Sequence, residues 1–374
     1  MLINMEVRHM AKYEMFQDLF VLELANNHWG NVERGLAIIE QFAQVVRQNC
    51  VKAAIKLQFR DVPKFVHKDF ISNSDIRYVK KTIDTQLSVA ELGVLSEAIR
   101  NSGCLVMATP FDEKSVDTCV DLNMDIIKIA SSDIQDWRLI RKIAETGKPV
   151  IFSTGGSTIQ EIDRLVSFFE ERDIPIAINH CVSIYPSEDN ELEMNQIDFF
   201  RERYPNHVIG FSTHEYHDWS TSMYIAYAKG ARTFERHIDI EADGIPVSPY
   251  CSLPHQVDEW MRAYKKAAAM CGKLGIEKRK PPQKELDYLN SLVRGTYLKR
   301  DLLEGTVLTE DDVYFAIPLQ TGQINCRQFI AGTVLSNDVA KDRALLSDDI
   351  HINTTNSVAE MQASVIGPSG KGTR

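Results

Sequence analysis

The sequence predicts an α/β protein in which a (β/α)8 TIM barrel is followed by a small C-terminal β-rich domain. Short runs rich in β-branched residues alternate with longer segments of helical period, and this alternation occurs eight times. The alternating stretch ends near Lys273, which suits a barrel of about 250 residues. An open doubly wound sheet alternates in the same way. However, no glycine-rich phosphate loop follows the first predicted strand, which favours the barrel.

The elements follow in chain order from this alternation. Strands are expected at the β-branched runs Phe20–Asn27, Ala53–Phe59, Cys104–Phe111, Asp125–Ser131, Pro149–Gly155, Ile176–Ser183, Val208–His214 and Thr233–Asp239. Amphipathic stretches between them predict helices over Val32–Gln48, Val89–Ser102, Asp136–Thr146, Thr158–Arg172 and Trp219–Lys229.

The composition of the sequence changes after the barrel, which we expect to span residues 1–275. Residues 276–291 are charged and contain prolines, as is typical of a linker. Residues 292–352 hold short strands, turns and two similar phrases, KRDLLEGTVLTEDDV and FIAGTVLSNDVAKDRALLSDDI, which predict a small β domain. The polar tail over 353–374 is expected to be disordered.

The composition argues against several classes of protein. The chain has 42 basic and 52 acidic residues and a net charge of -10, which argues against binding to nucleic acid or to anionic membranes. It contains neither an apolar run of about 18 residues nor a secretory signal at its start. The seven cysteines are scattered and never spaced as CxxC, which fits neither a disulfide framework nor a zinc site. We therefore expect a reduced, cytoplasmic enzyme.

Polar residues occupy the ends of the predicted strands, where barrel enzymes carry their active sites. Lys56 and Lys128 lie inside strands, and a lysine is costly to bury unless an anion meets it. The pair therefore predicts a site for a phosphate or carboxylate. The alternative is that each lysine reaches solvent at its tip. Hydroxyl side chains at nearby strand ends support the anion site; these are Thr109, Ser131, Ser153, Ser183 and Ser212.

Two histidines end the seventh and eighth predicted strands. His214 and His237 could share a divalent metal, although a histidine pair hydrogen-bonded to carboxylates is an equally simple interpretation. Alternation puts Glu235 on the same face as His237, and Glu23 belongs to the first strand. These carboxylates suit metal binding or proton transfer.

With these residues assigned, the sequence resembles the sialic acid synthases, which condense phosphoenolpyruvate with N-acetylmannosamine or a related sugar. The resemblance extends from about Leu19 to Ile350 and rests on eight phrases in order. They are ELANNHWG, IKLQ, ATPFD, KIASSD, STGG, HCVSIYP, GFSTHE and FERHID, each at a predicted strand end. The C-terminal domain resembles the antifreeze-like (SAF) domain fused to these synthases.

The resemblance implies roles position by position. It implies Mn2+ or Mg2+ at His214 and His237, and a sugar site at Glu23, Gln58, Tyr185 and Glu235. It also implies a phosphoenolpyruvate site at Lys56, Thr109, Lys128, Ser131, Ser153, Ser183 and Ser212. Glu23, Lys56, Lys128 and Glu235 are the expected catalytic residues, and either glutamate could transfer the proton. The family further implies a domain-swapped homodimer, in which the antifreeze-like domain of one chain covers the barrel mouth of the other.

Several positions depart from the family pattern. Thr213 stands where the family has an aspartate, and Ser183 where it usually has an asparagine. Ser248 and Ile317 replace an aspartate and an arginine that read the sugar. We therefore expect an acceptor other than N-acetylmannosamine. Two other functions remain as alternatives to a synthase of sialic-acid type: a related 3-deoxy-ulosonate synthase that uses a non-N-acylated sugar, and a catalytically dead binding barrel. Ice binding is disfavoured because residues 293–350 lack a threonine-rich face.

Overall fold

The computed structural model describes residues 13–72, 75–273 and 277–351. The chain divides into two compact units, residues 1–274 and residues 275–374. Each unit is described by itself below. The predicted tail over 353–374 lies outside the described residues.

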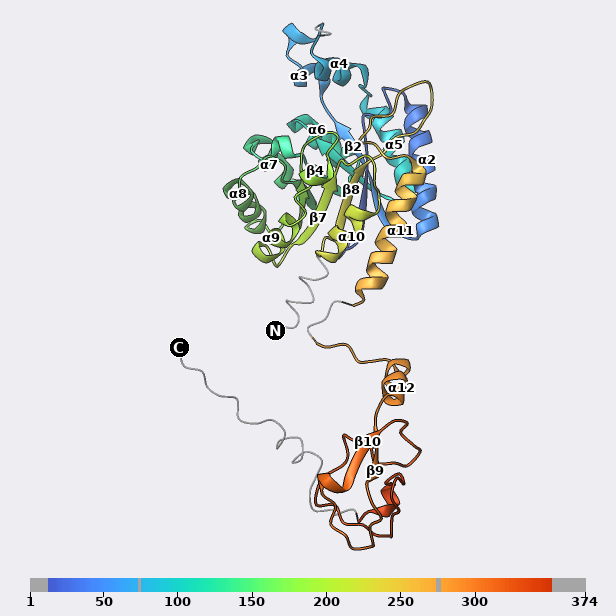
Figure 1. Ribbon diagram of the computed structural model, residues 1–374. Coiled ribbons are helices and arrows are strands. Elements are labelled where there is room, and N and C mark those ends of the chain that lie inside the picture. Colours follow the sequence, from blue (N-terminus) through green and yellow to red (C-terminus); the bar gives the residue numbers. More distant parts are fainter. Residues whose placement is uncertain (1–12, 73–74, 274–276, 352–374) are drawn as a thin grey trace. The chain divides into compact units, whose positions relative to one another are not determined.

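The first unit is a closed barrel of eight parallel strands in sequential order (Figure 1). The strands are β1 (Leu19–Ala25), β2 (Lys52–Phe59), β3 (Leu105–Pro110), β4 (Ile126–Ile129), β5 (Val150–Ser153), β6 (Ile176–Cys181), β7 (Val208–Thr213) and β8 (Thr233–His237). β8 pairs with β1 from Leu19 opposite Thr233 to Glu23 opposite His237, and this pairing closes the barrel. The predicted TIM barrel is therefore confirmed, and the open sheet is excluded.

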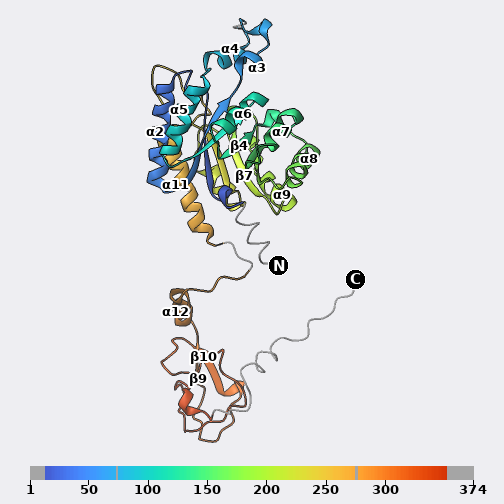
Figure 2. The same ribbon diagram turned by 180° about the vertical axis from the view of Figure 1, so that it is seen from behind.

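Helices cover the outside of the barrel (Figure 2). They are α2 (Val32–Asn49), α5 (Val89–Asn101), α6 (Glu113–Asp121), α7 (Trp137–Ala144), α8 (Ile159–Glu170), α9 (Gln196–Arg203), α10 (Thr221–Ala228) and α11 (Pro254–Cys271). Polar caps fix several of their starts: the Asn31 side chain accepts from the backbone of Arg34, and Ser88 and Thr158 form capping boxes.

An insertion between β2 and α5 was not expected from the sequence. It consists of α3 (Val62–Phe65), a short 3-10 helix (Lys68–Phe70) and α4 (Arg77–Asp84). In Figure 1 it extends beyond the carboxyl end of β2. It therefore stands at the end of the barrel that carries the predicted polar residues.

The barrel interior is apolar at one end and polar at the other. At the amino-terminal ends of the strands, inward-facing apolar side chains form one cluster together with Tyr13 and Phe16, which precede β1. Its strand members are Leu19, Val21, Ala54, Met107, Ile126, Ile151, Ala177 and Val208. A larger cluster fills the space between strands and helices. The carboxyl half of the interior is left to polar side chains, as is usual where barrel enzymes hold their substrates.

The second unit has a small core of its own around an antiparallel pair, β9 (Gly295–Leu298) and β10 (Val313–Ala316). Its buried apolar residues are Leu298, Leu302, Leu308, Val313, Ile324, Leu335, Val339 and Leu345. Before it, α12 (Gln283–Ser291) lies in the segment expected to be a linker. None of the residues of α12 is buried. Across the described parts of both units, no helix is long and apolar enough to cross a membrane.

Candidate active site

A cavity of about 750 Å3 opens at the carboxyl ends of the strands. All of the residues that the sequence analysis assigned to the site line it together. They are Glu23, Lys56, Gln58, Thr109, Lys128, Ser131, Ser153, Ser183, Tyr185, Ser212, His214, Glu235 and His237. The structure thus brings these side chains to one place, and their individual roles stay predictions.

Two lysines and a glutamate form a buried ion-pair network on the cavity floor. Lys56 Nζ lies 2.8 Å from Glu235 Oε1, and Lys128 Nζ lies 2.6 Å from Glu235 Oε2. Lys56 also contacts the carboxylate of Glu23. Lys56 and Lys128 are 4% and 2% exposed, so neither reaches solvent as the alternative interpretation required. The network keeps two cations in the barrel interior, where a bound anion would meet them.

The network sets the protonation of its members. Burial lowers the pKa of Lys56 to about 8, although Glu235 opposes this shift. Burial alone would raise the pKa of Glu235, but Lys128 and Lys56 outweigh it and hold that pKa well below its usual range. Glu235 is therefore a fixed negative charge that anchors both lysines.

Hydroxyl groups surround the ends of the lysines. Lys128 Nζ donates to Ser153 Oγ at 2.7 Å, and the Oγ1 of Thr109 is buried with no hydrogen-bond partner. The backbone N–H of Gly155 donates to Ser131 Oγ at 3.1 Å. A Cβ at Gly155 would lie 2.1 Å from Ser183 Oγ, so only glycine lets the chain approach these hydroxyls. The arrangement is a cradle of short donors suited to an oxyanion.

The two histidines at the ends of β7 and β8 face each other, with ring centroids 5.5 Å apart. His214 Nδ1 lies 3.0 Å from the carbonyl oxygen of Val182. Because a carbonyl can only accept, Nδ1 carries the proton and Nε2 keeps its lone pair. Burial lowers the pKa of His214 to about 4 and that of His237 well below its usual value. Both rings are therefore neutral, which is the form that binds metals.

These features fit the predicted divalent metal. The Nδ1 atom of His237 is buried and has no hydrogen-bond partner. Among the described residues, no group of three or more His, Cys, Asp or Glu side chains gathers around the pair. A metal here would therefore be held by two imidazoles and would take its other oxygen ligands from water or substrate.

Two tyrosines wall the cavity beside the histidines. The Tyr185 ring centroid lies 3.9 Å from that of His214, and the Tyr250 centroid lies 5.2 Å from those of Tyr185 and His237. Tyr250 lines the cavity, whereas Ser248, which stands where the family has a sugar-binding aspartate, is not among its lining residues. The loop after β8 thus presents an aromatic side chain where a polar contact was expected.

Buried arginines outside the cavity fix the loops that carry the site. Arg236, next to His237 but on the outer face of β8, pairs with Glu215 at 2.5 Å. Arg34 pairs with Asp239 at 2.7 Å and donates to the backbone of Asn27. The loops after β1, β7 and β8 are thereby tied to the helical layer, which keeps the histidines in place.

The sequence analysis missed several lining residues, namely Asn26, Asn27, Arg60, Arg77, Lys81 and Tyr250. Arg60 continues the alternation of Lys56 and Gln58 and could have been found from it. Arg77 and Lys81 stand four apart, which puts them on one face of a helix. Their helix was itself not predicted.

Comparisons with known proteins agree with this geometry. A family model described as NeuB family matches residues 46–275, more than half of the chain. The crystal structure of a candidate spore coat polysaccharide biosynthesis protein E from Chromobacterium violaceum is 35% identical, covers 90% of this chain and all of that one, and superposes with a TM-score of 0.84. A sialic acid synthetase from Leptospira borgpetersenii is 26% identical, with 73% and 91% of the two chains covered and a TM-score of 0.64.

Curated sequences point the same way. The N-acetylneuraminate-9-phosphate synthase of Drosophila melanogaster is 30% identical over 63% of this chain and 64% of its own length. The family match and the closed barrel agree with the resemblance drawn from the eight phrases. The chain belongs to the NeuB family.

Proposed function

We propose that the protein condenses phosphoenolpyruvate with an open-chain aldose to give a sialic-acid-type 3-deoxy-ulosonate and inorganic phosphate. The observation that carries this proposal is the cavity itself, where a buried pair of lysines faces a pair of neutral histidines across one carboxylate. The lysine pair suits an anionic substrate such as phosphoenolpyruvate. The histidine pair suits a divalent metal, which would polarise the sugar carbonyl that phosphoenolpyruvate attacks.

In this reaction, carbon 3 of phosphoenolpyruvate bonds to the aldehyde carbon of the sugar, and the aldehyde oxygen becomes a hydroxyl. Water adds at carbon 2, and the bond between carbon 2 and the phosphate oxygen breaks to release phosphate. Lys56, Lys128 and the hydroxyls of Thr109, Ser131, Ser153, Ser183 and Ser212 bind the phosphate and carboxylate of phosphoenolpyruvate. Their fixed positions hold the two anionic groups beside carbon 2, where positive charge develops as carbon 3 attacks, and stabilise the phosphate as it leaves.

Glu23 is the better of the two candidates for proton transfer. Glu235 contacts both lysines, which hold its pKa far too low for it to carry a proton near neutral pH. Glu23 contacts only Lys56 among the lysines and accepts from the amide of Gln58 at 3.1 Å. Glu23 is therefore the carboxylate that can take the proton from the attacking water.

A divalent metal, Mn2+ or Mg2+, supplies Lewis-acid activation of the aldehyde oxygen when bound. His214 and His237 would hold it through their neutral ring nitrogens. The hydrogen bond from His214 to Val182 orients one ring, and the buried Arg236–Glu215 pair fixes the strand ends.

The acceptor sugar is a separate question. The similar proteins include synthases named for sialic acid and for its 9-phosphate, so their names do not define one acceptor. Ser248 and Ile317, where the family's charged sugar contacts were expected, support an acceptor other than N-acetylmannosamine. A dead binding barrel has little support, because every expected catalytic side chain lines the cavity.

The test is a substrate screen on the full chain with phosphoenolpyruvate and a panel of four- to six-carbon aldoses in the presence of Mn2+. We expect aldose-dependent phosphate release and a product whose mass equals the two substrates plus water minus phosphoric acid. Glu23→Gln should lower turnover strongly while leaving phosphoenolpyruvate affinity nearly unchanged. Absence of phosphate release with every sugar would refute the proposed reaction.

A further inference from the structure

Arg60 lines the cavity, yet the proposed reaction gives it no role. It directly follows β2 and continues the alternation of Lys56 and Gln58 at the carboxyl end of this strand. Its guanidinium carbon lies 3.8 Å from the ring centroid of Phe111, and its Nη2 donates to Tyr78 Oη at 2.8 Å. Phe111 follows β3 and Tyr78 belongs to α4, so Arg60 is held between the barrel and the insertion.

Carboxylates of the protein lie near Arg60. Burial lowers the pKa of Arg60, and Tyr78 opposes this shift. The carboxylates of Asp133 and Asp112 oppose it as well. Burial also raises the pKa of Asp133 to about 6, although Ser132 and Arg60 act in the other direction. Arg60 therefore has protein anions around it while it directs hydrogen bonds at neutral groups, which suits a link within the protein more than a site for a free anion.

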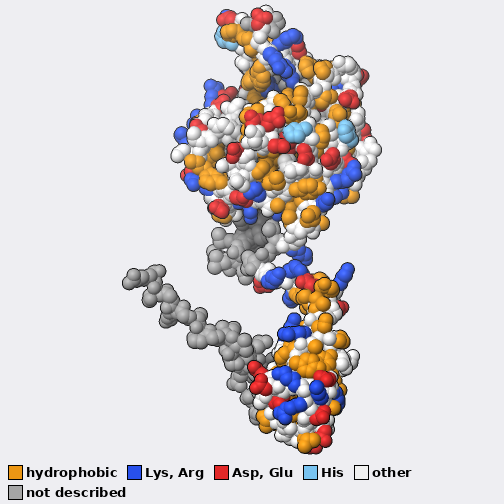
Figure 3. Space-filling model, viewed as in Figure 1, with side chains coloured by type: hydrophobic (Ala, Val, Ile, Leu, Met, Phe, Trp, Pro, Cys, Tyr) orange, Lys and Arg blue, Asp and Glu red, His pale blue; other side chains and the backbone are white. Residues whose placement is uncertain are grey.

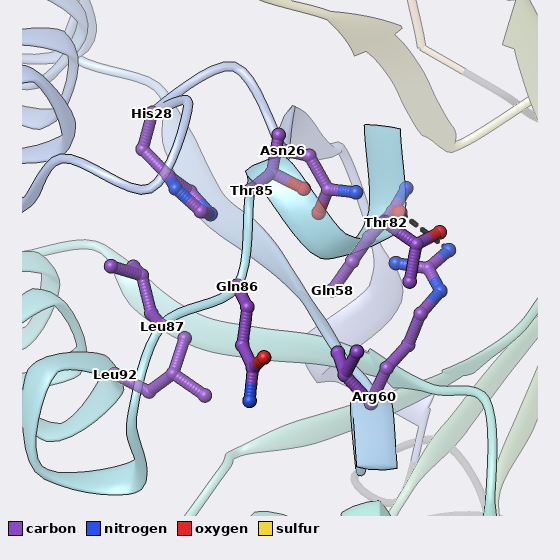
Figure 4. Close-up of a pocket in the computed structure, with 10 residues that line it drawn as sticks. Asn26, His28, Gln58, Arg60, Thr82, Thr85, Gln86, Leu87 and Leu92 are labelled. Carbon is purple, nitrogen blue, oxygen red and sulfur yellow. Dashed lines mark hydrogen bonds between the residues drawn. The ribbon is translucent and has the colours of Figure 1, made fainter. Parts of the chain in front are cut away.

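Gln58 connects Arg60 to Glu23. Arg60 Nη2 donates to Gln58 Oε1 at 3.0 Å, and Gln58 Nε2 donates to Glu23 Oε1 at 3.1 Å. Figure 4 shows the Arg60 side chain turned back toward Gln58, with the first of these bonds drawn as a dashed line. A guanidinium can only donate and an ionised carboxylate can only accept, so an amide between them satisfies both in a single orientation. Arg60 thereby fixes which end of the Gln58 amide faces Glu23.

The position of the Glu23 carboxylate depends on this amide. Glu23 is 1% exposed, and Lys56 contacts its Oε2 while Gln58 donates to its Oε1. An amide turned the other way would place an oxygen against the carboxylate oxygen, and two acceptors cannot bond to each other. A general base must lie within hydrogen-bond reach of the proton that it takes. The orientation of Glu23 therefore matters for turnover more than for substrate binding.

We propose that Arg60 is a positioning residue, which orients Glu23 through the amide of Gln58 for proton transfer from the attacking water. This inference rests on the proposed function, in which Glu23 is the base. Arg60 acts through another side chain rather than on the reacting atoms. Its loss should therefore lower turnover and leave the binding of both substrates almost unchanged.

The kinetic test compares Arg60→Met with the parent chain at saturating substrates. We expect kcat to fall about ten-fold or more, with the KM of the sugar and the affinity for phosphoenolpyruvate within two-fold. Arg60→Lys keeps a charged donor and should recover part of the lost turnover. Because Arg60 acts through Gln58, adding Arg60→Met to Gln58→Leu should cause no further loss of kcat.

A second measurement needs no turnover. The side-chain amide of Gln58 is followed by NMR in the full chain grown with isotope-labelled glutamine, and its resonance is identified by its absence in Gln58→Leu. This resonance should shift in Arg60→Met, because the amide then loses the donor that fixes its orientation.

The matched control is Arg172→Met. Arg172 follows α8, its guanidinium carbon lies 3.7 Å from the ring centroid of Phe168, and it is not among the residues that line the cavity. Its loss should alter neither kcat nor the Gln58 resonance. An unmoved resonance in Arg60→Met overturns the inference, as does an additive loss in the double variant or a main effect on substrate binding. A shifted resonance in a protein whose parent chain releases no phosphate refutes the proposed reaction and leaves the link from Arg60 to Glu23 standing.

Discussion

Lys128 tests the floor of the cavity most directly, because it is 2% exposed and contacts both Ser153 and Glu235. Lys128→Met keeps the length of the side chain and removes its charge. Glu235 keeps Lys56 as a partner, so the network loses one cation without stranding the carboxylate. We expect phosphoenolpyruvate affinity to fall by about 2–3 kcal/mol, the contribution of a charged hydrogen bond, or roughly 30- to 150-fold.

Direct titration of phosphoenolpyruvate measures this loss. Lys148→Met is the control. Lys148 lies two residues before β5, at the opposite end of the barrel, and among the described residues its ammonium group donates only to Asn123. Unchanged affinity in Lys128→Met would show that the floor lysines serve another purpose.

The variant His237→Ala tests whether the site binds a divalent metal. In His237→Ala, one of two neutral imidazole donors is lost, so Mn2+ binding measured by equilibrium dialysis should become at least ten-fold weaker. His217→Ala removes a histidine that is exposed and paired with Asp189, and it should bind Mn2+ as the parent chain does. Chelation should abolish phosphate release, and Mn2+ or Mg2+ should restore it. Full activity in the presence of excess EDTA would contradict the metal role.

The residues of the site were predictable to the extent that they belong to strands. Alternation assigned Lys56, Lys128 and Glu235 to the barrel interior, because a strand residue has only two faces to occupy. Tyr250 lies in the loop after β8, and no periodicity determines the path of such a loop. The same reason explains why the position of the family's sugar-binding aspartate was matched to Ser248 and Tyr250 was not considered.

At the scale of single elements, the stabilising contribution of the loop between β1 and α2 should depend on pH. His28 is 2% exposed there, and its Nδ1 accepts from the backbone N–H of Gly30 at 3.1 Å. Burial lowers the pKa of His28 from 6.5 to about 4, with Glu91 opposing the shift. Between these two values the unfolded chain binds a proton that the folded chain does not. The contribution of His28 to stability is therefore full above pH 6.5 and lost as the pH falls toward 4, by up to about 3 kcal/mol.

Denaturant unfolding at pH 7 and pH 4.5 measures this contribution. His28→Gln keeps an acceptor for Gly30 but does not titrate, so its free energy of unfolding should fall less between the two pH values than that of the parent chain. His217→Gln, at an exposed position, should follow the parent chain. Identical pH dependence in His28→Gln and the parent chain would mean that the loop does not keep this ring neutral.

The eight strands were predictable because each is a β-branched run, but several predicted strands extended too far. The residues Ser153 to Gly155 illustrate why: the strand ends at Ser153, and the backbone at Gly155 leaves the sheet and approaches the hydroxyls of Ser131 and Ser183. Six described helices lie outside the predicted stretches; they are α3, α4, α6, α9, α11 and α12. The sequence of α4, RYVKKTID, is only eight residues long, and α12 buries none of its residues.

At the scale of the whole molecule, the cationic cavity stands in contrast to the net charge of -10. On the face of the barrel unit seen in Figure 3, acidic and basic side chains are interspersed. Anionic substrates are therefore attracted by the local groups of the cavity rather than by a uniform field.

The second unit carries the last prediction. Its own core is small, and it exposes apolar side chains at Leu292, Leu303, Val307, Ile317 and Ile330. So small a core gives little stability of its own, and the exposed apolar side chains could contribute to docking on another surface. We expect this unit to cap a barrel mouth, and we expect the cap to come from the partner chain of a homodimer. Removal of residues 281–374 should then abolish phosphate release. The truncated chain should still give the circular dichroism spectrum of a folded α/β barrel.

A complementation experiment separates a cap from the partner from a cap within one chain. The truncated chain keeps an intact cavity and lacks the cap, whereas full-length Lys128→Met keeps the cap and lacks the floor cation. When the two are mixed and allowed to exchange subunits, a cap supplied by the partner restores phosphate release at the truncated barrel, because only there do an intact floor and a cap meet. A cap supplied within one chain restores nothing, since each chain then still lacks one of the two parts. Wild-type turnover by the truncated chain alone would show that the barrel needs no cap from either source.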